Sequence, residues 1–152
     1  MQIRDLMSRY VEVVAHNTAV REAAMKMRDL KVTMLPVCDG PLLAGIITIR
    51  DIALRLAAEG YDAMLTEVGE IMTRDLTFCF EDQPLEEAAM IMESYQIDRL
   101  PVLDRNRRLV GIISLSDIAA HERQQHSAPA APELTAVPSQ YSAAMVAAPK
   151  QR

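Results

Sequence analysis

The sequence is poor in the groups from which catalytic and metal sites are built. It has two cysteines and three histidines in 152 residues. Cys38 and Cys79 lie within apolar runs in different halves, so we expect two buried thiols, with a disulfide or a metal pair as the alternative. His16, His121 and His126 lack the His-x3-His spacing of a helical metal site. No nucleophile elbow, P-loop or Cys-x-x-Cys motif occurs, so the sequence does not favour an enzyme.

Runs of basic residues and long apolar runs are also missing. The formal net charge is −5, and lysine and arginine do not cluster as a nucleic-acid surface requires. No apolar run reaches the roughly 18 residues that span a bilayer. The first residues contain no signal-peptide apolar segment. We therefore expect a cytoplasmic protein with neither a nucleic-acid nor a membrane partner.

What the chain does have is an internal repeat, with a spacing of 65 residues as from Leu35 to Leu100. The matched segments are Leu6-Met7 with Ile71-Met72, Ala23-Ala24-Met25 with Ala88-Ala89-Met90, and Leu35-Pro36-Val37 with Leu100-Pro101-Val102. We place the first copy at 1–65 and the second at 66–121. The remainder, 122–152, is rich in alanine and proline and is expected to be disordered in isolation, with 141–148 as a candidate docking helix.

Each copy reads as β-α-β-β-α, which predicts an α/β fold. Apolar runs predict strands at 11–14, 32–37 and 42–47 in the first copy, and at 76–80, 97–103 and 109–113 in the second. Helices should begin near Asn17 and near Asp82, with Pro84 in the first turn of the latter. Pro36 and Pro101 lie inside predicted strands, where each should mark an edge or a break in pairing.

One motif closes each copy: Gly-Ile-Ile, a hydroxyl residue, two spacers and an aspartate. It runs from Gly45 through Thr48 to Asp51, and from Gly111 through Ser114 to Asp117. The hydroxyl residue is a natural N-cap, so each strand should lead directly into a helix. The free N–H groups, the hydroxyl and the carboxylate could together hold a sugar phosphate. The alternative is a plain capping box, in which the aspartate bonds back to the cap residue.

These repeated motifs resemble a pair of CBS domains, named for cystathionine β-synthase, over residues 1–121. The resemblance implies two repeats related by a pseudo-twofold axis, with sheets packed face to face, helices outside, and two clefts for adenosine-containing ligands. It implies ribose contacts from Asp51 and Asp117. The other residues that it implies are Thr48 and Ser114 at phosphate, with Thr33, Met34, Asp98 and Arg99 nearby, and Pro36, Pro101, Val14 and Phe78 around the base.

The two clefts should not be equal. Arg50 precedes the first aspartate, whereas Ser116 precedes the second. Asp98 stands where the family often has a basic residue, and a carboxylate near phosphates costs affinity unless Arg99 offsets it. Arg50 and Arg99 are each either ligand contacts or solvated surface charges.

The resemblance implies a regulatory module rather than an enzyme. It would sense an adenosyl compound, with AMP, ADP, ATP, S-adenosylmethionine and NAD as candidates, and would form a homodimer, a disc of four repeats. The alternative is a dimerisation or interaction platform that needs no ligand.

Overall fold

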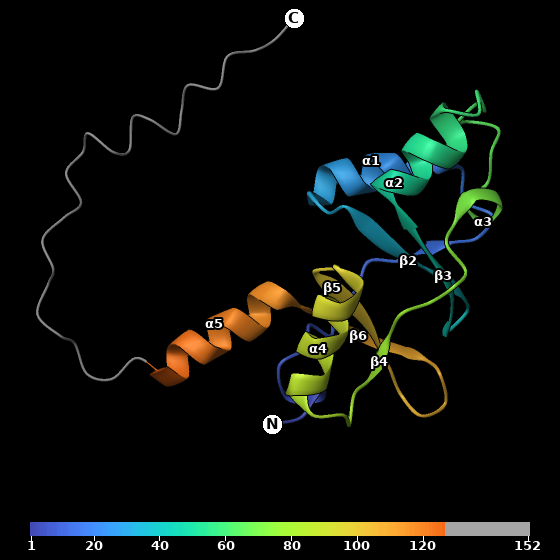
Figure 1. The fold of residues 1–152 in the computed structure, drawn as a ribbon. Helices are drawn as coiled ribbons and strands as arrows, with labels where there is room; N and C mark the ends of the chain where they lie inside the picture. The colour runs from blue at the N-terminus through green and yellow to red at the C-terminus, as the bar shows by residue number, and fades with distance from the viewer. Residues whose placement is uncertain (127–152) are drawn as a thin grey trace, which may run out of the picture.

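The computed structural model describes residues 1–126, which form two three-stranded sheets, one in each repeat (Figure 1). The predicted tail beyond residue 126, with its candidate helix at 141–148, lies outside the described residues. In the first sheet, β1 (Val14–Ala15) is parallel to β2 (Met34–Asp39), which is antiparallel to β3 (Leu42–Thr48). The second sheet repeats this order with β4 (Cys79–Phe80), β5 (Arg99–Leu103) and β6 (Leu109–Ser114). The predicted α/β class and the two repeats are confirmed.

The first strand of each copy is much shorter than predicted. The expected runs at 11–14 and 76–80 shrink to the two-residue strands β1 and β4. The reason is that β1 finds only Val37 and Cys38 as partners, and β4 only Val102 and Leu103. The connector that precedes each short strand is held by one isolated bridge, at Ser8 or at Thr73, and its residues 9–13 or 74–78 are unpaired, which leaves their side chains available to line a cavity.

The helices repeat as closely as the strands do. Helices α1 (Val20–Leu30) and α4 (Leu85–Tyr95) are both 11 residues long, and each ends in a left-handed residue, Lys31 or Gln96, with φ of 56°. Both begin later than predicted, and Pro84 is the N-cap of α4 rather than a residue of its first turn. An extended backbone at Ala19 and Pro84 (ψ of 140° and 146°) delays the start of each helix.

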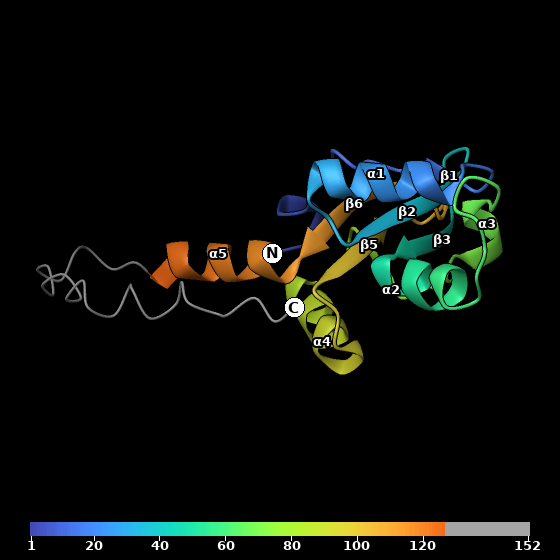
Figure 2. The ribbon, with the colours of Figure 1, turned by 90° about the horizontal axis from the view of Figure 1, so that it is seen from above.

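The last helices of the two copies differ. In the first, α2 (Ile49–Asp51) continues as the π-helix η2 (Ile52–Ala57). The short helix α3 (Val68–Ile71) then opens the second copy, as the 3-10 helix η1 (Ile3–Asp5) opens the first. In the second, α5 (Leu115–His126) is a regular α-helix that runs past the expected boundary at 121 and projects from the body of the molecule (Figure 2). Within the described residues no helix is both long and apolar enough to cross a membrane.

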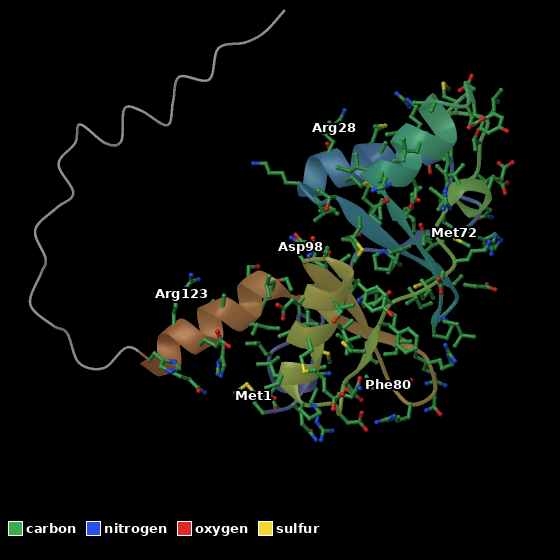
Figure 3. The ribbon with its side chains drawn as sticks, viewed as in Figure 1. Met1, Arg28, Met72, Phe80, Asp98 and Arg123 are labelled. Carbon is green, nitrogen blue, oxygen red and sulfur yellow. The ribbon has the colours of Figure 1, made fainter. Side chains whose placement is uncertain are left out.

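The two hydrophobic cores exchange their lead-in segments. Ile3 and Met7 of the first copy are buried with Cys79, Leu85 and Leu100 of the second. In turn, three residues from the start of the second copy are buried in the core of the first: Val68, Ile71 and Met72. Figure 3 shows Met72 beside the first sheet, although it follows that sheet by more than twenty residues in the chain. The sequence boundary at 65–66 therefore does not separate two independent packing units.

Each strand proline lies in the central strand of its sheet, so the predicted edge is wrong, whereas the predicted break in pairing is right. Pro36 pairs with Ile46 on β3, while the pairing with β1 begins one residue later. Ile46 needs no donor from the proline, because its N–H and C=O both bond to Thr73 (3.0 and 2.8 Å). Pro101 and Ile112 repeat this arrangement with Ser8. A proline is tolerated here because the opposite residue takes its hydrogen bonds from the exchanged segment.

Candidate ligand-binding site

Both Gly-to-Asp motifs fold as capping boxes at the start of a helix. In the first, the backbone N–H of Thr48 donates to Asp51 Oδ2 (2.9 Å), and Asp51 N–H donates to Thr48 Oγ1 (3.1 Å). In the second, Ser114 N–H donates to Asp117 Oδ2 (3.1 Å), and Asp117 N–H donates to Ser114 Oγ (3.2 Å). The capping role is thus present in both copies. It uses only one carboxylate oxygen of each aspartate, so the second oxygen decides what else each can bind.

In the first copy the protein itself occupies that second oxygen. Thr73 Oγ1 donates to Asp51 Oδ1 (2.9 Å), and Arg55 Nε lies 3.8 Å from the same oxygen. The guanidinium of Arg55 also donates to the carbonyls of Ile71 and Met72 (3.3 and 3.1 Å). The Asp51 side chain is only 7% exposed. Its hydrogen-bonding capacity is therefore directed into the protein.

In the second copy the equivalent oxygen is left open. Asp117 Oδ2 takes both bonds from Ser114, and Oδ1 accepts none from the described part of the chain. The residue that corresponds to Thr73 is Ser8, whose hydroxyl donates instead to the carbonyl of Tyr10 (3.3 Å). The residue that corresponds to Arg55 is His121, which pairs with a side chain on its own helix. Asp117 thus keeps an acceptor that Asp51 has lost.

Asp117 lines a cavity of about 360 Å³ between the two repeats. Its polar lining from the second repeat is Ser114, Ser116 and Asp117 at the start of α5, together with Arg99 on β5. Met34, Leu35 and Pro36 of β2 supply an apolar lining from the first repeat. A carboxylate beside hydroxyls suits a polyhydroxyl group, one arginine suits a single phosphate, and the apolar strand suits a flat base.

The connector before β1 closes one side of this cavity with Ser8, Tyr10, Val11 and Glu12. Glu12 pairs with Lys26 at 2.9 Å and accepts the Tyr10 hydroxyl at 2.7 Å. The hydrogen bond from Lys26, followed by the one from Tyr10, lowers the pKa of Glu12 below its usual value. The same contact with Glu12 raises the pKa of Tyr10. Glu12 is therefore an anion at neutral pH, and Arg99 is the cation among the cavity's described lining residues.

Of the residues predicted from the sequence, this cavity brings together Met34, Pro36, Arg99, Ser114 and Asp117. Thr48 and Asp51 belong to the closed network instead. Sequence reasoning missed Ser8, Tyr10 and Glu12, because the connector carries no motif. The matched spacing of Ser8 and Thr73 in the repeat was the signal that could have found the first of them.

The remaining predicted polar residues lie on the surface. Thr33 and Asp98 are exposed, and their carbonyls accept the N–H groups of Ile49 (3.0 Å) and Leu115 (2.8 Å) at the helix starts. Arg50 is exposed as well. Thr33 and Asp98 thus contribute their backbone carbonyls, rather than their side chains, to the motif.

The predicted apolar residues are placed in three different environments. Pro101 is buried, and its carbonyl accepts the thiol of Cys79 at 3.7 Å. Val14 is buried and lines a neighbouring groove against α1. Phe78 packs edge-on against Phe80, which Figure 3 labels, with ring centroids 5.5 Å apart.

Both cysteines are free and buried, so the expected thiols are confirmed and a mutual disulfide is absent. Within residues 1–126 no group of three or more potential metal ligands occurs.

Comparison with known proteins agrees with this architecture. The family model described as "CBS domain" matches twice, at residues 3–58 and 68–123. The chain is 39% identical over 126 residues to the CBS domain-containing protein YhcV of Bacillus subtilis, covering 83% of this chain and 89% of that protein.

Two similar solved structures hold adenosyl ligands. One is the CBS domain pair of protein MJ0100 in complex with 5′-methylthioadenosine and S-adenosyl-L-methionine (TM-score 0.69, 34% identity, 82% of this chain and 98% of that one). The other is CBSX2 in complex with AMP (TM-score 0.70, 27% identity, 82% of this chain and 97% of that one). The family model covers most of the described chain in two copies. The protein therefore belongs to the CBS-domain family and carries two CBS domains in tandem.

Proposed function

We propose that the chain is a regulatory module that binds an adenosyl compound in the Asp117 cavity and passes the signal on through the geometry of a dimer. The observation that carries the proposal is the open Oδ1 of Asp117 in a cavity that also contains Ser114, Ser116 and Arg99. The adenosyl ligands of the MJ0100 and CBSX2 structures support the ligand class. A signal arises only if the ligand prefers one arrangement of the protein over another.

The charges of the cavity favour ligands with little negative charge. Glu12, which is paired with Lys26, and Asp117 both line it, and Arg99 is the one lysine or arginine among its described lining residues. Each further phosphate would add repulsion without a new partner. Among the candidates AMP, ADP, ATP, S-adenosylmethionine and NAD, we therefore expect AMP and S-adenosylmethionine to bind more tightly than ATP.

A thermal-shift panel with these five compounds tests the proposal. A ligand of the native state at 100 times its Kd adds about 2.7 kcal/mol of stability, which raises Tm by several degrees. The protein should first be refolded from denaturant to remove any co-purified ligand. We expect a rise with AMP or S-adenosylmethionine that Asp117→Asn abolishes and Arg50→Ala leaves unchanged. No rise with any compound would contradict the proposal.

A specific observation also favours the second candidate, a platform that needs no ligand. Both motif aspartates already serve as helix caps, so their presence is explained without a ligand. The platform predicts that Asp117→Asn changes no response to adenosyl compounds, because there is none to lose. The same thermal-shift panel therefore separates the two functions.

For the dimer, we propose that the exposed apolar residues on equivalent positions of the two repeats form the contact. Met25 on α1 corresponds to Met90 on α4, and both are exposed. Ile49 and Leu115 form a second exposed pair at the helix starts. Sedimentation equilibrium should give the mass of a dimer for the wild type. The double variant Met25→Lys, Met90→Lys should shift it towards monomer. Leu65→Lys, a change at an exposed loop residue, is the control, and equal masses for all three proteins would contradict this surface.

A further inference from the structure

We propose that each chain binds one adenosyl ligand rather than two, because its own Thr73 and Arg55 permanently occupy the site at Asp51. We call the network of Asp51, Thr73 and Arg55 the latch, because it holds the segment 71–73, which joins the two repeats, against α2 and η2. This inference rests on the proposed function for its ligand, and it adds which of the two equivalent sites is used and what the other one does.

The two sites are equivalent in backbone position. Thr73 exchanges two backbone hydrogen bonds with Ile46 on β3 (3.0 and 2.8 Å). Ser8 exchanges the corresponding two with Ile112 on β6 (2.9 and 2.8 Å). The two connectors thus lie in the same place relative to their capping boxes. The backbones diverge only after the aspartates, where the first copy continues as the π-helix η2 and the second as the regular helix α5.

The side chains differ at two matched positions. The hydroxyl of Thr73 donates to Asp51 Oδ1 at 2.9 Å, whereas that of Ser8 turns to the carbonyl of Tyr10. Arg55 lies one helical turn after Asp51 and faces the same oxygen, while His121 takes that position in the second repeat. Asp51 therefore receives a hydroxyl and a cation from the protein, and Asp117 receives neither on its Oδ1.

The occupied site mimics a bound ligand. A ribose hydroxyl would donate to the aspartate as Thr73 now does, and a ligand at Asp51 would first have to displace that bond. It would also have to separate a nearly buried carboxylate from Arg55, and an unpaired buried charge is costly. At Asp117 no described group donates to Oδ1, so a ligand breaks no such bond there. The free energy of binding therefore favours Asp117.

The Asp51 network also joins parts of the chain that are distant in sequence. Arg55 donates to the carbonyls of Ile71 and Met72, and Thr73 follows directly, so α2 and η2 hold the connector from 71 to 73. This is the segment whose residues Ile71 and Met72 are buried in the first core. Loosening the latch should therefore lower stability even when no ligand is present.

Isothermal titration of the full chain with AMP, and in parallel with S-adenosylmethionine, tests the site count. We expect a stoichiometry of one ligand per chain. Asp117→Asn keeps a cap acceptor for Ser114 but loses the charge, so it should weaken binding at least about tenfold. Asp51→Asn should change the affinity by less than about twofold.

The latch is tested without ligand, using matched hydroxyl deletions. Thr73→Val should lower Tm by roughly 5 °C, because it leaves a buried carboxylate oxygen without its hydroxyl donor. Ser8→Ala, at the equivalent position, should change Tm by less than about 1 °C. Asp51→Asn should lower Tm, whereas Asp117→Asn should not.

The measurements test the single site, the latch and the proposed function separately. Two ligands per chain, or equal weakening by Asp51→Asn and Asp117→Asn, would overturn the single site and leave the proposed function standing. Equal Tm values for Thr73→Val and Ser8→Ala would overturn the latch. If neither probe binds the wild type, the proposed function and the single site both fail, while the Tm series still decides the latch.

Discussion

Met7 at the start of the chain packs directly on Gly111 of β6, in the opposite repeat. A Cβ at Gly111 would lie 2.6 Å from Met7 Sδ and 2.9 Å from the carbonyl oxygen of Ser8. The thioether can move, but Ser8 is held by two backbone bonds to Ile112. Glycine is required here for the close approach of two backbones.

We therefore predict that Gly111→Ala destabilises the protein by about 1–3 kcal/mol through overpacking. Urea unfolding followed by circular dichroism should show a lower midpoint. Gly45→Ala should behave alike, since its Cβ would lie 2.7 Å from Met72 Sδ and 2.9 Å from the carbonyl of Thr73. Arg50→Ala on the surface is the control. An unchanged midpoint for Gly111→Ala would show that the segment with Met7 and Ser8 can move aside for the added methyl group.

The exchange of lead-in segments predicts that the repeats do not fold separately. Ile3 is fully buried in the core of the second repeat, so Ile3→Ala should cost about 2–5 kcal/mol. The exposed Leu65→Ala is its control. A fragment of residues 66–126 lacks Ile3 and Met7 and should show no cooperative thermal transition. Mixing it with the fragment 1–65 should restore one. Independent folding of either fragment would contradict the exchange.

The sequence predicted what is local and periodic. The alternation and the spacing of apolar residues located the second and third strands of each copy and the helices α1 and α4, because each depends on residues within a few positions. The duplicated Gly-to-Asp motif located both helix starts, since a capping box is formed within four residues.

The sequence could not predict which segments pack together across the repeats. Leu6-Met7 and Ile71-Met72 are matched segments near the start of their own copies, yet Met7, Ile71 and Met72 are buried in the other copy's core and Leu6 packs against it. The same limit applies to the site. Asp51 and Asp117 have equal motifs, and they differ because Thr73, 22 residues beyond Asp51, bonds to the first of them. Contacts over such separations leave no periodic pattern to read.

Cys79 should be inert in the native state and should make stability depend on alkaline pH. It is 1% exposed, and burial raises the pKa of its thiol to about 12. At pH 8 iodoacetamide should label it only after unfolding. Above pH 9 the unfolded thiol ionises while the folded one stays protonated, so unfolding becomes more favourable. Between pH 9 and 12 the free energy of unfolding should therefore fall, by up to about 1.4 kcal/mol per pH unit from this group.

Cys79→Ala separates this effect from the ionisation of tyrosines. The variant will lose some packing at every pH, so the slope against pH is compared rather than the absolute stability. We expect a shallower slope in the variant between pH 9 and 11. Equal slopes, or rapid labelling of the native thiol, would contradict the burial of Cys79.

Arg99 should set the preference of the cavity for a phosphate. It lines the cavity from β5, and the residue at the equivalent position of β2, which also lines it, is the uncharged Met34. Arg99→Met should therefore weaken AMP about tenfold, through the loss of one charge-assisted contact, and should change adenosine less than about twofold. Raising the ionic strength should weaken AMP binding to the wild type more than to the variant, because salt screens the exposed part of the pair. Arg50→Met removes an exposed cation beside Asp51 and should leave both affinities unchanged. Equal losses for AMP and adenosine in Arg99→Met would mean that the arginine supports the cavity by packing rather than by charge.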